Sequence, residues 1–262
     1  MSYSSILFEV VDQVAVIKLN RPEAANALTK ELCDELLDAA IRCETDPGIR
    51  AAVLTGSGNL FCAGGDLKAF DDHMDDIKAY VTATATALHN AAIRFNTMNP
   101  PLVMAINGTA GGGGFSLSLC GDYAIASSSA KFVAAYTASG LSPDGTSTYF
   151  LAKHIGLLRA KELFFTNRVL SAEEALDWGL ISKVVEPDQV LDEAMTLARK
   201  FAAGPTRAFG ATKRLLNTAY TESIAMQLDH ETRSIADTLY SRDGRHGLKA
   251  FLNKEKPEFT GE

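Results

Sequence analysis

The sequence lacks the features that mark membrane, nucleic-acid-binding and secreted proteins. No run of about 18 apolar residues occurs, and the first residues show no basic leader followed by an apolar stretch. The net charge is -7, from 25 Lys and Arg against 32 Asp and Glu, and this negative charge disfavours binding to nucleic acid or an anionic membrane. We therefore expect no nucleic-acid partner, no membrane partner and a cytoplasmic location.

The chain also lacks metal-ligand and disulfide patterns. Its cysteines, Cys33, Cys43, Cys62 and Cys120, form no C-x-x-C pair, and the five histidines include no H-E-x-x-H. Small buried thiols are the ordinary interpretation of such scattered cysteines. We expect neither a metal site nor a disulfide framework.

Segments with strand and helix patterns alternate along the chain, which is typical of an α/β fold. The predicted elements are a strand pair around Asp12 and Gln13, a helix from Thr29 to the TDPG turn, strands at 51–56 and 102–106, a helix at 81–94, and strands at 123–127 and 131–136. Ser171 and Glu174 form a capping-box pattern at the start of another helix. Beyond Pro187 the pattern is almost entirely helical. We therefore divide the chain into a core, residues 1–187, and a helical region, residues 188–262.

Two glycine runs stand out, Gly111–Gly114 and Gly64–Gly65. Glycine permits positive φ and lets the backbone approach a ligand closely. Neither a P-loop lysine nor a G-x-G-x-x-G pattern accompanies the longer run, which disfavours a nucleotide phosphate. Two amides from the two runs would instead suit an oxyanion hole. Tight turns and close helix packing explain the glycines equally well at this stage.

Five motifs resemble the enoyl-CoA hydratase/isomerase (crotonase) family in their order and spacing. They are NRPEAANAL, FCAGGDL, INGTAGGGG, SAKF and SAEEALDWGLISKVV, and together they span essentially the whole chain. The resemblance implies a crotonase (ClpP/crotonase-like) spiral of β-β-α turns with a C-terminal helical trimerisation region. It also implies that the Gly65 and Gly113 amides hold the thioester carbonyl of an acyl-CoA and stabilise an enolate.

The chain departs from the hydratases of this family at both of their paired glutamates. Ser116 and Tyr136 occupy those positions, which puts water addition in doubt. Asp144 matches the single acid of family isomerases that move a double bond, including the ring-epoxide isomerase of phenylacetate catabolism. The resemblance then implies that Asp144 carries a proton from C2 to C4. Asp144 also lies in the tripeptide P-D-G, which is common in turns, so a structural role in a turn is the alternative interpretation.

Other functions remain open. The segments SAKFV, SPDGTSTY and FTNR also resemble 4-chlorobenzoyl-CoA dehalogenase, in which an aspartate attacks the ring. His89 falls at the histidine position of that enzyme. Tyr136 and Gly65 stand where that enzyme has aromatic residues, which weakens this hypothesis. A hydratase-type lyase and a non-catalytic crotonase-fold binding protein are further alternatives.

The resemblance assigns the acyl-CoA contacts and the assembly. CoA is part of the substrate, so no separate cofactor is expected, and a homotrimer or a dimer of trimers is implied. Phe251 and Lys254 of a neighbouring subunit would lie near the nucleotide. The expected substrate-binding residues are Ala24, Ala63, Asp66, Leu67, His89, Gly112, Tyr136, Phe251 and Lys254.

Overall fold

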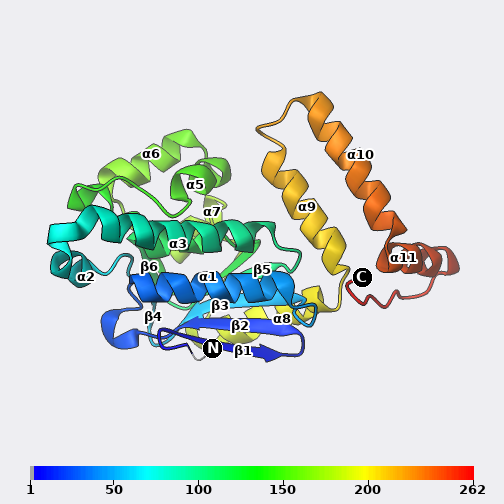
Figure 1. The fold of residues 1–262 in the computed structure, drawn as a ribbon, viewed down its shortest axis with the longest axis horizontal. Coiled ribbons are helices and arrows are strands. Elements are labelled where there is room, and N and C mark those ends of the chain that lie inside the picture. The colour runs from blue at the N-terminus through cyan, green and yellow to red at the C-terminus, as the bar shows by residue number, and fades with distance from the viewer. Residues whose placement is uncertain (1–2) are drawn as a thin grey trace.

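The computed structural model describes residues 3–262, which form two β-sheets and surrounding helices (Figure 1). The larger sheet has the order β1-β2-β3-β5-β7-β10, and the smaller has the order β4-β6-β8-β9. The strands of the larger sheet are β1 (Ile6–Val11), β2 (Val14–Leu19), β3 (Ala51–Gly56), β5 (Leu102–Ile106), β7 (Tyr123–Ser127) and β10 (Lys183–Val185). Those of the smaller sheet are β4 (Leu60–Cys62), β6 (Thr109–Gly111), β8 (Lys131–Val133) and β9 (Leu170–Ser171).

The chain winds between the two sheets as a spiral. Strands β3, β5 and β7 of the larger sheet are followed by β4, β6 and β8 of the smaller sheet, respectively. After β4 and β6 the chain returns through helices to the larger sheet, whereas after β8 it passes through two helices to β9 before it reaches β10. These helices are α2 (Leu67–Asp72) and α3 (Ile77–Thr97), α4 (Gly112–Ser118), and α5 (Ser147–Ile155) and α6 (Leu157–Thr166). The expected spiral of β-β-α turns is therefore confirmed.

Local sequence signals begin several elements as predicted. β1 and β2 pair antiparallel around Asp12 and Gln13, whose φ values of 52° and 64° fit a tight hairpin turn. The Thr29 side chain accepts from Leu32 N–H and starts α1 (Lys30–Thr45). Ser171 and Glu174 form the predicted capping box of α7 (Ala172–Asp177).

The central strands β2, β3 and β5 of the larger sheet are buried on both faces. Alternate residues of β2, β3 and β5 point to opposite sides, as the strand period requires. One side, which includes Ile17 and Leu54, packs in the same core as α1 and α3. The other side, which includes Val53 and Val103, packs on α8 (Val190–Ala202). Helix α8, the first long helix after residue 187, therefore packs on the sheet and does not join the helices that follow it.

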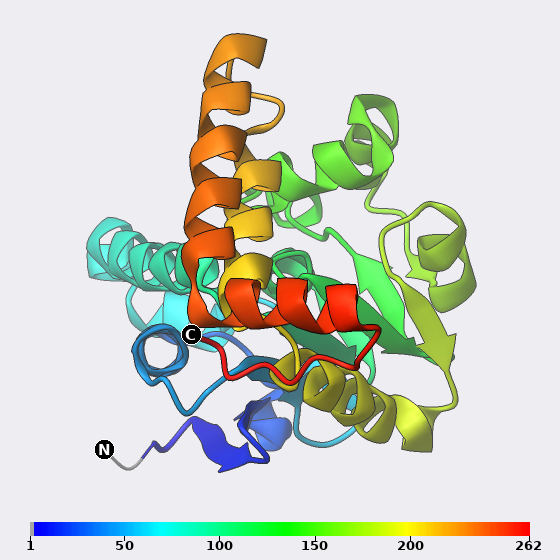
Figure 2. The same cartoon turned by 90° about the vertical axis from the view of Figure 1, so that its right-hand side faces the viewer.

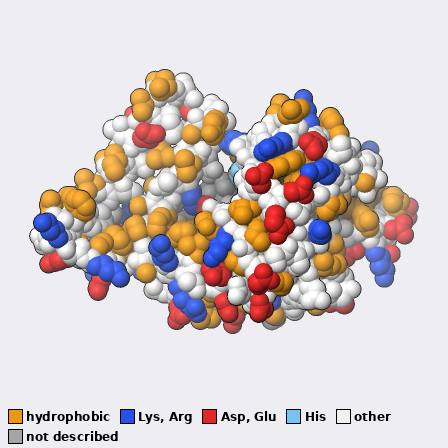
Figure 3. Space-filling view, turned by 180° about the vertical axis from the view of Figure 1, so that it is seen from behind, with side chains coloured by type: hydrophobic (Ala, Val, Ile, Leu, Met, Phe, Trp, Pro, Cys, Tyr) orange, Lys and Arg blue, Asp and Glu red, His pale blue; other side chains and the backbone are white. Residues whose placement is uncertain are grey.

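The last three helices project from the body of the molecule (Figures 1 and 2). They are α9 (Thr206–Thr218), α10 (Ile224–Tyr240) and α11 (Arg242–Asn253). Many of their apolar side chains are exposed, and Figure 3 shows apolar groups spread over the lobe that they form. None of the helices within residues 3–262 is long and apolar enough to cross a membrane.

Short 3-10 turns complete the chain and lie near the motifs. They are η1 (Pro22–Ala24), η2 (Met74–Asp76), η3 (Thr137–Ser139) and η4 (Pro187–Gln189). η3 lies between β8 and the loop that carries Asp144. The fold therefore brings the segment after β8 to the same region as the first turn of α4.

Candidate active site

A cavity of about 450 Å³ contains both glycine runs and the predicted acid. It lies where α2 and α3 face the segment between β8 and α5. The lining residues are Leu28, Cys33, Ala63, Gly65, Leu67, Phe70, Val81, Thr82, Thr84, Ala85, Leu88, Gly112, Gly113, Ala135, Tyr136, Ser139, Leu141, Ser142 and Asp144. Asp144 is the single acidic side chain among them.

The two glycine runs meet back to back on one wall of this cavity. Gly64 has a φ of 107°, and a Cβ there would lie 2.9 Å from Gly111 O, so the close approach requires glycine. A Cβ on Gly113 would lie 3.7 Å from Gly65 N, which shows how near the two segments are. Gly113 lies in the first turn of α4, where amides have no acceptor within the helix. The Gly65 N–H has no acceptor within residues 3–262. Both amides are therefore available to a ligand at this wall of the cavity.

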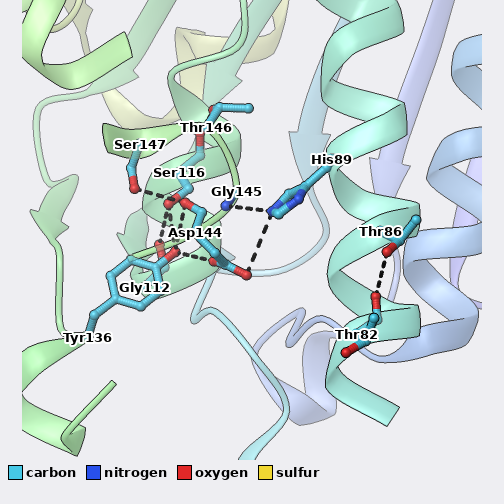
Figure 4. Close-up of polar contacts among 10 residues, drawn as sticks. All are labelled: Thr82, Thr86, His89, Gly112, Ser116, Tyr136, Asp144, Gly145, Thr146 and Ser147. Carbon is cyan, nitrogen blue, oxygen red and sulfur yellow. Dashed lines mark hydrogen bonds and ion pairs between the residues drawn. The ribbon is translucent and has the colours of Figure 1, made fainter. Parts of the chain in front are cut away.

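The loop that carries Asp144 is held in a left-handed conformation by several hydrogen bonds (Figure 4). Gly145 has a φ of 62° and Thr146 a φ of 85°. Gly145 N–H donates to His89 Nε2 at 3.0 Å, and Thr146 Oγ1 donates to Ser116 O at 3.3 Å. Ser147 Oγ donates to Asp144 O at 2.8 Å. These contacts fix the backbone of Asp144 against α3 and α4.

The two carboxylate oxygens of Asp144 have different neighbours. Tyr136 OH lies 2.8 Å from Oδ1, and His89 Nε2 lies 3.9 Å from Oδ2. The Asp144 side chain is 38% exposed, so solvent reaches it in the absence of a ligand. Tyr136 OH also lies 2.6 Å from Ser116 Oγ, a fully buried hydroxyl. Burial raises the pKa of Tyr136, and the charge of Asp144 raises it further, so the phenol stays protonated.

The structure brings most of the predicted site residues together. Gly65, Gly113, Asp144, Ala63, Leu67, Gly112 and Tyr136 line the cavity, and His89 touches the Asp144 loop. Ala24, Asp66, Phe251 and Lys254 are not among its lining residues. Phe251 and Lys254 lie at the end of α11, where Phe251 is 81% exposed.

The carboxylate of Asp66 contacts other protein groups and does not line the cavity. It caps α2 by accepting from Ala69 N–H at 3.1 Å, and it pairs with Arg21 at 2.9 Å. Burial alone would raise the pKa of Asp66, but the Ala69 amide and the Arg21 guanidinium outweigh burial and lower it. The contacts of Asp66 in this structure are therefore those of a helix cap.

Sequence reasoning missed the apolar part of the lining. Val81, Ala85 and Leu88 share one face of α3 at helical spacing, which is the one signal that pointed to them. Phe70 follows from no motif. Its ring packs so closely against Gly65 that a Cβ on Gly65 would lie 2.8 Å from Phe70 Cζ. The side chain of Phe70 thus supplies an aromatic wall next to the Gly65 amide.

The lining contains no group suited to metal binding or thiolate chemistry. No cluster of three His, Cys, Asp or Glu residues within residues 3–262 could hold a metal ion. Cys33 lines the cavity, but burial raises its pKa to about 12. A thiol in that state is a poor nucleophile. The chemistry available to the cavity is therefore that of one carboxylate, several hydroxyl groups and backbone amides.

Comparison with known proteins agrees with this geometry. The family model described as enoyl-CoA hydratase/isomerase matches residues 9–262. The chain belongs to this family. It is 38% identical over 257 residues to the 1,2-epoxyphenylacetyl-CoA isomerase of Escherichia coli, with 98% of each chain covered. A probable enoyl-CoA hydratase of Rhodobacter capsulatus is 35% identical over 261 residues, with 100% of each chain covered.

A solved structure supports the fold of this enoyl-CoA hydratase/isomerase family member. An enoyl-CoA hydratase from Polaromonas sp. superposes with a TM-score of 0.93 at 33% identity, covering 98% of this chain and 100% of that chain. The family and the fold predicted from the motifs are thus confirmed. Because the relatives include both an isomerase and hydratases, the reaction has to be argued from the side chains of the site.

Proposed function

We propose that this protein is an acyl-CoA isomerase that moves a double bond from C3 to C2, or performs the related isomerisation of a ring epoxide. One observation carries the proposal: Asp144 is the single acid in the cavity that also contains the Gly65 and Gly113 amides. The similarity to a relative named as an isomerase gives independent support. One carboxylate suffices for a reaction that removes a proton and returns it.

In the proposed mechanism the acyl-CoA carbonyl oxygen accepts from the Gly65 and Gly113 amides. The Asp144 carboxylate removes a proton from C2 of a 3-enoyl-CoA, and the electron pair of that C–H bond delocalises onto the carbonyl oxygen. The two amides stabilise the resulting dienolate. Asp144 then gives the proton to C4, which leaves a 2-enoyl-CoA and regenerates the carboxylate.

Hydration would require groups that this cavity lacks. Water addition needs one group to activate water and a second to protonate carbon, a task suited to paired acids. Ser116 and Tyr136 occupy the glutamate positions, and burial raises the pKa of Tyr136. Neither side chain therefore supplies a carboxylate to activate water.

The dehalogenase hypothesis has one observation in its favour, namely that His89 lies beside Asp144. In that reaction the aspartate would attack an aromatic ring as a nucleophile. However, Tyr136 donates to Asp144 where that enzyme has tryptophan, and Gly65 replaces an aromatic residue. The ring of Phe70, which packs on Gly65, makes this alternative worth including in the assay.

We also propose the substrate contacts and the assembly that the family resemblance implies. Phe70, Val81, Leu88 and Leu141 form an apolar wall for the acyl group. CoA enters as part of the substrate. Phe251 and Lys254 of a neighbouring copy would contact its nucleotide in a trimer or a dimer of trimers.

The test follows the ultraviolet absorbance of conjugated enoyl thioester with trans-3-hexenoyl-CoA, beside 2-hexenoyl-CoA for hydration and 4-chlorobenzoyl-CoA for halide release. We expect conjugation with the first substrate alone. Asp144→Asn is nearly isosteric but carries no base, and it should lower kcat by roughly 100-fold or more. The exposed Asp46→Asn is the matched control and should behave as wild type.

A CoA-binding titration accompanies both variants. Asp144→Asn should still bind CoA, because the amides and the apolar wall are unchanged. Full turnover in Asp144→Asn would remove Asp144 from the mechanism. Binding without turnover of any of the three substrates by the wild-type protein would point either to a ring substrate or to the non-catalytic alternative.

A further inference from the structure

The two positions where the hydratases carry glutamates are connected to Asp144 by a chain of hydroxyl groups. Ser116 Oγ lies 2.6 Å from Tyr136 OH, which lies 2.8 Å from Asp144 Oδ1. Ser116 is fully buried and Tyr136 is 8% exposed, so little water competes for these contacts. Figure 4 shows the three side chains converging from α4, from the residue before η3 and from the loop before α5.

When Asp144 is ionised, the hydroxyl hydrogens of Ser116 and Tyr136 both point towards its carboxylate. A carboxylate only accepts, and a phenol has one hydrogen, so Tyr136 donates to Asp144 Oδ1. The Tyr136 oxygen then accepts the Ser116 hydroxyl hydrogen. The one other acceptor that Ser116 Oγ reaches is Gly112 O, at the longer distance of 3.4 Å. The Ser116 hydroxyl therefore donates to Tyr136 and orients its phenol group.

The second carboxylate oxygen is left without a donor. Within residues 3–262, no hydrogen bond reaches Asp144 Oδ2. His89 Nε2 is 3.9 Å away and accepts from Gly145 N–H, so the neutral ring cannot also donate from this nitrogen. The arrangement therefore distinguishes a held oxygen, Oδ1, from a free one, Oδ2.

We propose that Tyr136, oriented by Ser116, is a positioning residue that holds Asp144 Oδ1 and leaves Oδ2 as the oxygen that carries the proton. This inference rests on the proposed isomerase function and deepens it. Oδ2 forms an O–H bond with the proton from C2 while the C–H electron pair enters the dienolate. Oδ2 then releases the same proton to C4. The hydroxyls of Ser116 and Tyr136 thus occupy the positions of the two glutamates, and Asp144 is the single base in the cavity.

The first test is Tyr136→Phe, which deletes one oxygen and keeps the ring. Losing a hydrogen bond to a charged group should lower kcat roughly 10- to 100-fold and leave KM within about twofold, because the CoA contacts remain. A change of kcat without a change of KM separates this positioning role from a general loss of structure.

Ser116→Ala removes only the outer of the two hydroxyl groups and should lower kcat about threefold, again with little change in KM. Ser118→Ala is its matched control, because Ser118 is buried on the same helix and donates only to Phe115 O. Tyr3→Phe is the matched control for the phenol, since Tyr3 donates to Asp38 at 2.6 Å outside the cavity. Both controls should keep the wild-type kcat and KM.

A crystal structure of Tyr136→Phe provides a readout that needs no turnover. We expect the Asp144 carboxylate to rotate or to occupy two orientations, with the backbone of the loop unchanged. An unmoved carboxylate together with a wild-type kcat would overturn the proposal. Failure of the isomerase function would instead appear as no isomerisation by the wild-type protein. The orientation of the carboxylate in Tyr136→Phe tests the positioning role in either case.

Discussion

His89 lies beside the proposed base, yet its hydrogen bonds indicate support of the loop rather than proton transfer. Nε2 accepts from Gly145 N–H at 3.0 Å, which leaves the ring hydrogen on Nδ1. The bond spans from α3 to a glycine with a φ of 62°, next to Thr146 with a φ of 85°. Such a backbone conformation persists only where its surroundings hold it.

Replacing His89 should therefore loosen the Asp144 loop. We expect His89→Leu to lower kcat roughly three- to tenfold, because Gly145 N–H loses its acceptor. His89→Gln offers an amide oxygen at similar reach and should recover most of that loss. The measurement is steady-state isomerisation by both variants, with the thermal midpoint as a control for folding. Equal loss in the two variants would contradict an acceptor role for His89.

For individual residues, the motifs predicted which backbone amides and which acid line the cavity, but they did not predict the contacts between side chains. Gly65, Gly113 and Asp144 were assigned from the family motifs, and the structure brings all three to one cavity. The contact of Tyr136 with Asp144 depends on the positive φ of Gly145 and Thr146 and on the close approach of α4. No pattern within either segment encodes that geometry. Phe70 escaped notice for the same reason.

Among the elements, α9 is joined to the core by an ion pair between a buried lysine and a partly buried aspartate. Lys213 Nζ lies 2.8 Å from Asp122 Oδ2 and donates to Phe95 O at 2.8 Å. Asp122 also accepts from Leu102 N–H at the start of β5. Burial lowers the pKa of Lys213 and raises that of Asp122, in each case against the effect of the partner's charge. Desolvation thus offsets much of the attraction, while the pair fixes where α9 leaves the core.

Breaking this pair on one side should be costly. Lys213→Met leaves the partly buried Asp122 carboxylate without its cation, and we expect the free energy of unfolding to fall by about 1–2 kcal/mol at pH 7. Adding Asp122→Asn removes that charge and keeps an acceptor for Leu102 N–H, so the double variant should be more stable than Lys213→Met. Urea unfolding at one protein concentration measures all three proteins.

The pH dependence of this variant follows from the raised pKa of Asp122. As the pH falls, the folded state of Lys213→Met takes up a proton on Asp122 before the unfolded state does, which stabilises the folded state. The difference in the free energy of unfolding between wild type and Lys213→Met should therefore narrow as the pH falls towards the ordinary pKa of an aspartate. A constant difference would show that the charge of Asp122 is not the cause of the loss.

The elements differ in how far the sequence alone predicts them. The hairpin at Asp12 and Gln13, the cap at Thr29 and the box at Ser171 depend on residues within a few positions, and all three form as predicted. The placement of α8 depends on which partner its apolar face finds. Val53 and Val103, far away in sequence, provide that partner on the sheet. Composition after residue 187 could not separate α8 from the helices that project.

In the molecule as a whole, the outer helices expose many large apolar side chains. Several large side chains on α10 and α11 are between 67% and 81% exposed: Ile224, Ile235, Tyr240, Phe251 and Leu252. Extended apolar patches of this kind mark protein interfaces. The proposed trimer would cover them with other copies of the chain, and the same contact would bring Phe251 and Lys254 to a neighbour's nucleotide site.

A charge placed in that surface should separate the copies. We expect Ile235→Glu to lower the mass measured by analytical ultracentrifugation from that of a trimer or hexamer towards that of one chain. Its KM for acyl-CoA should rise several-fold while kcat at saturation changes less, because the neighbour's contacts bind CoA and do not touch the reacting carbons. Leu7→Glu on β1 is the control, since Leu7 is 49% exposed and lies outside these helices. A wild-type protein that sediments as a single chain and binds acyl-CoA as tightly as Ile235→Glu would contradict both the assembly and the shared site.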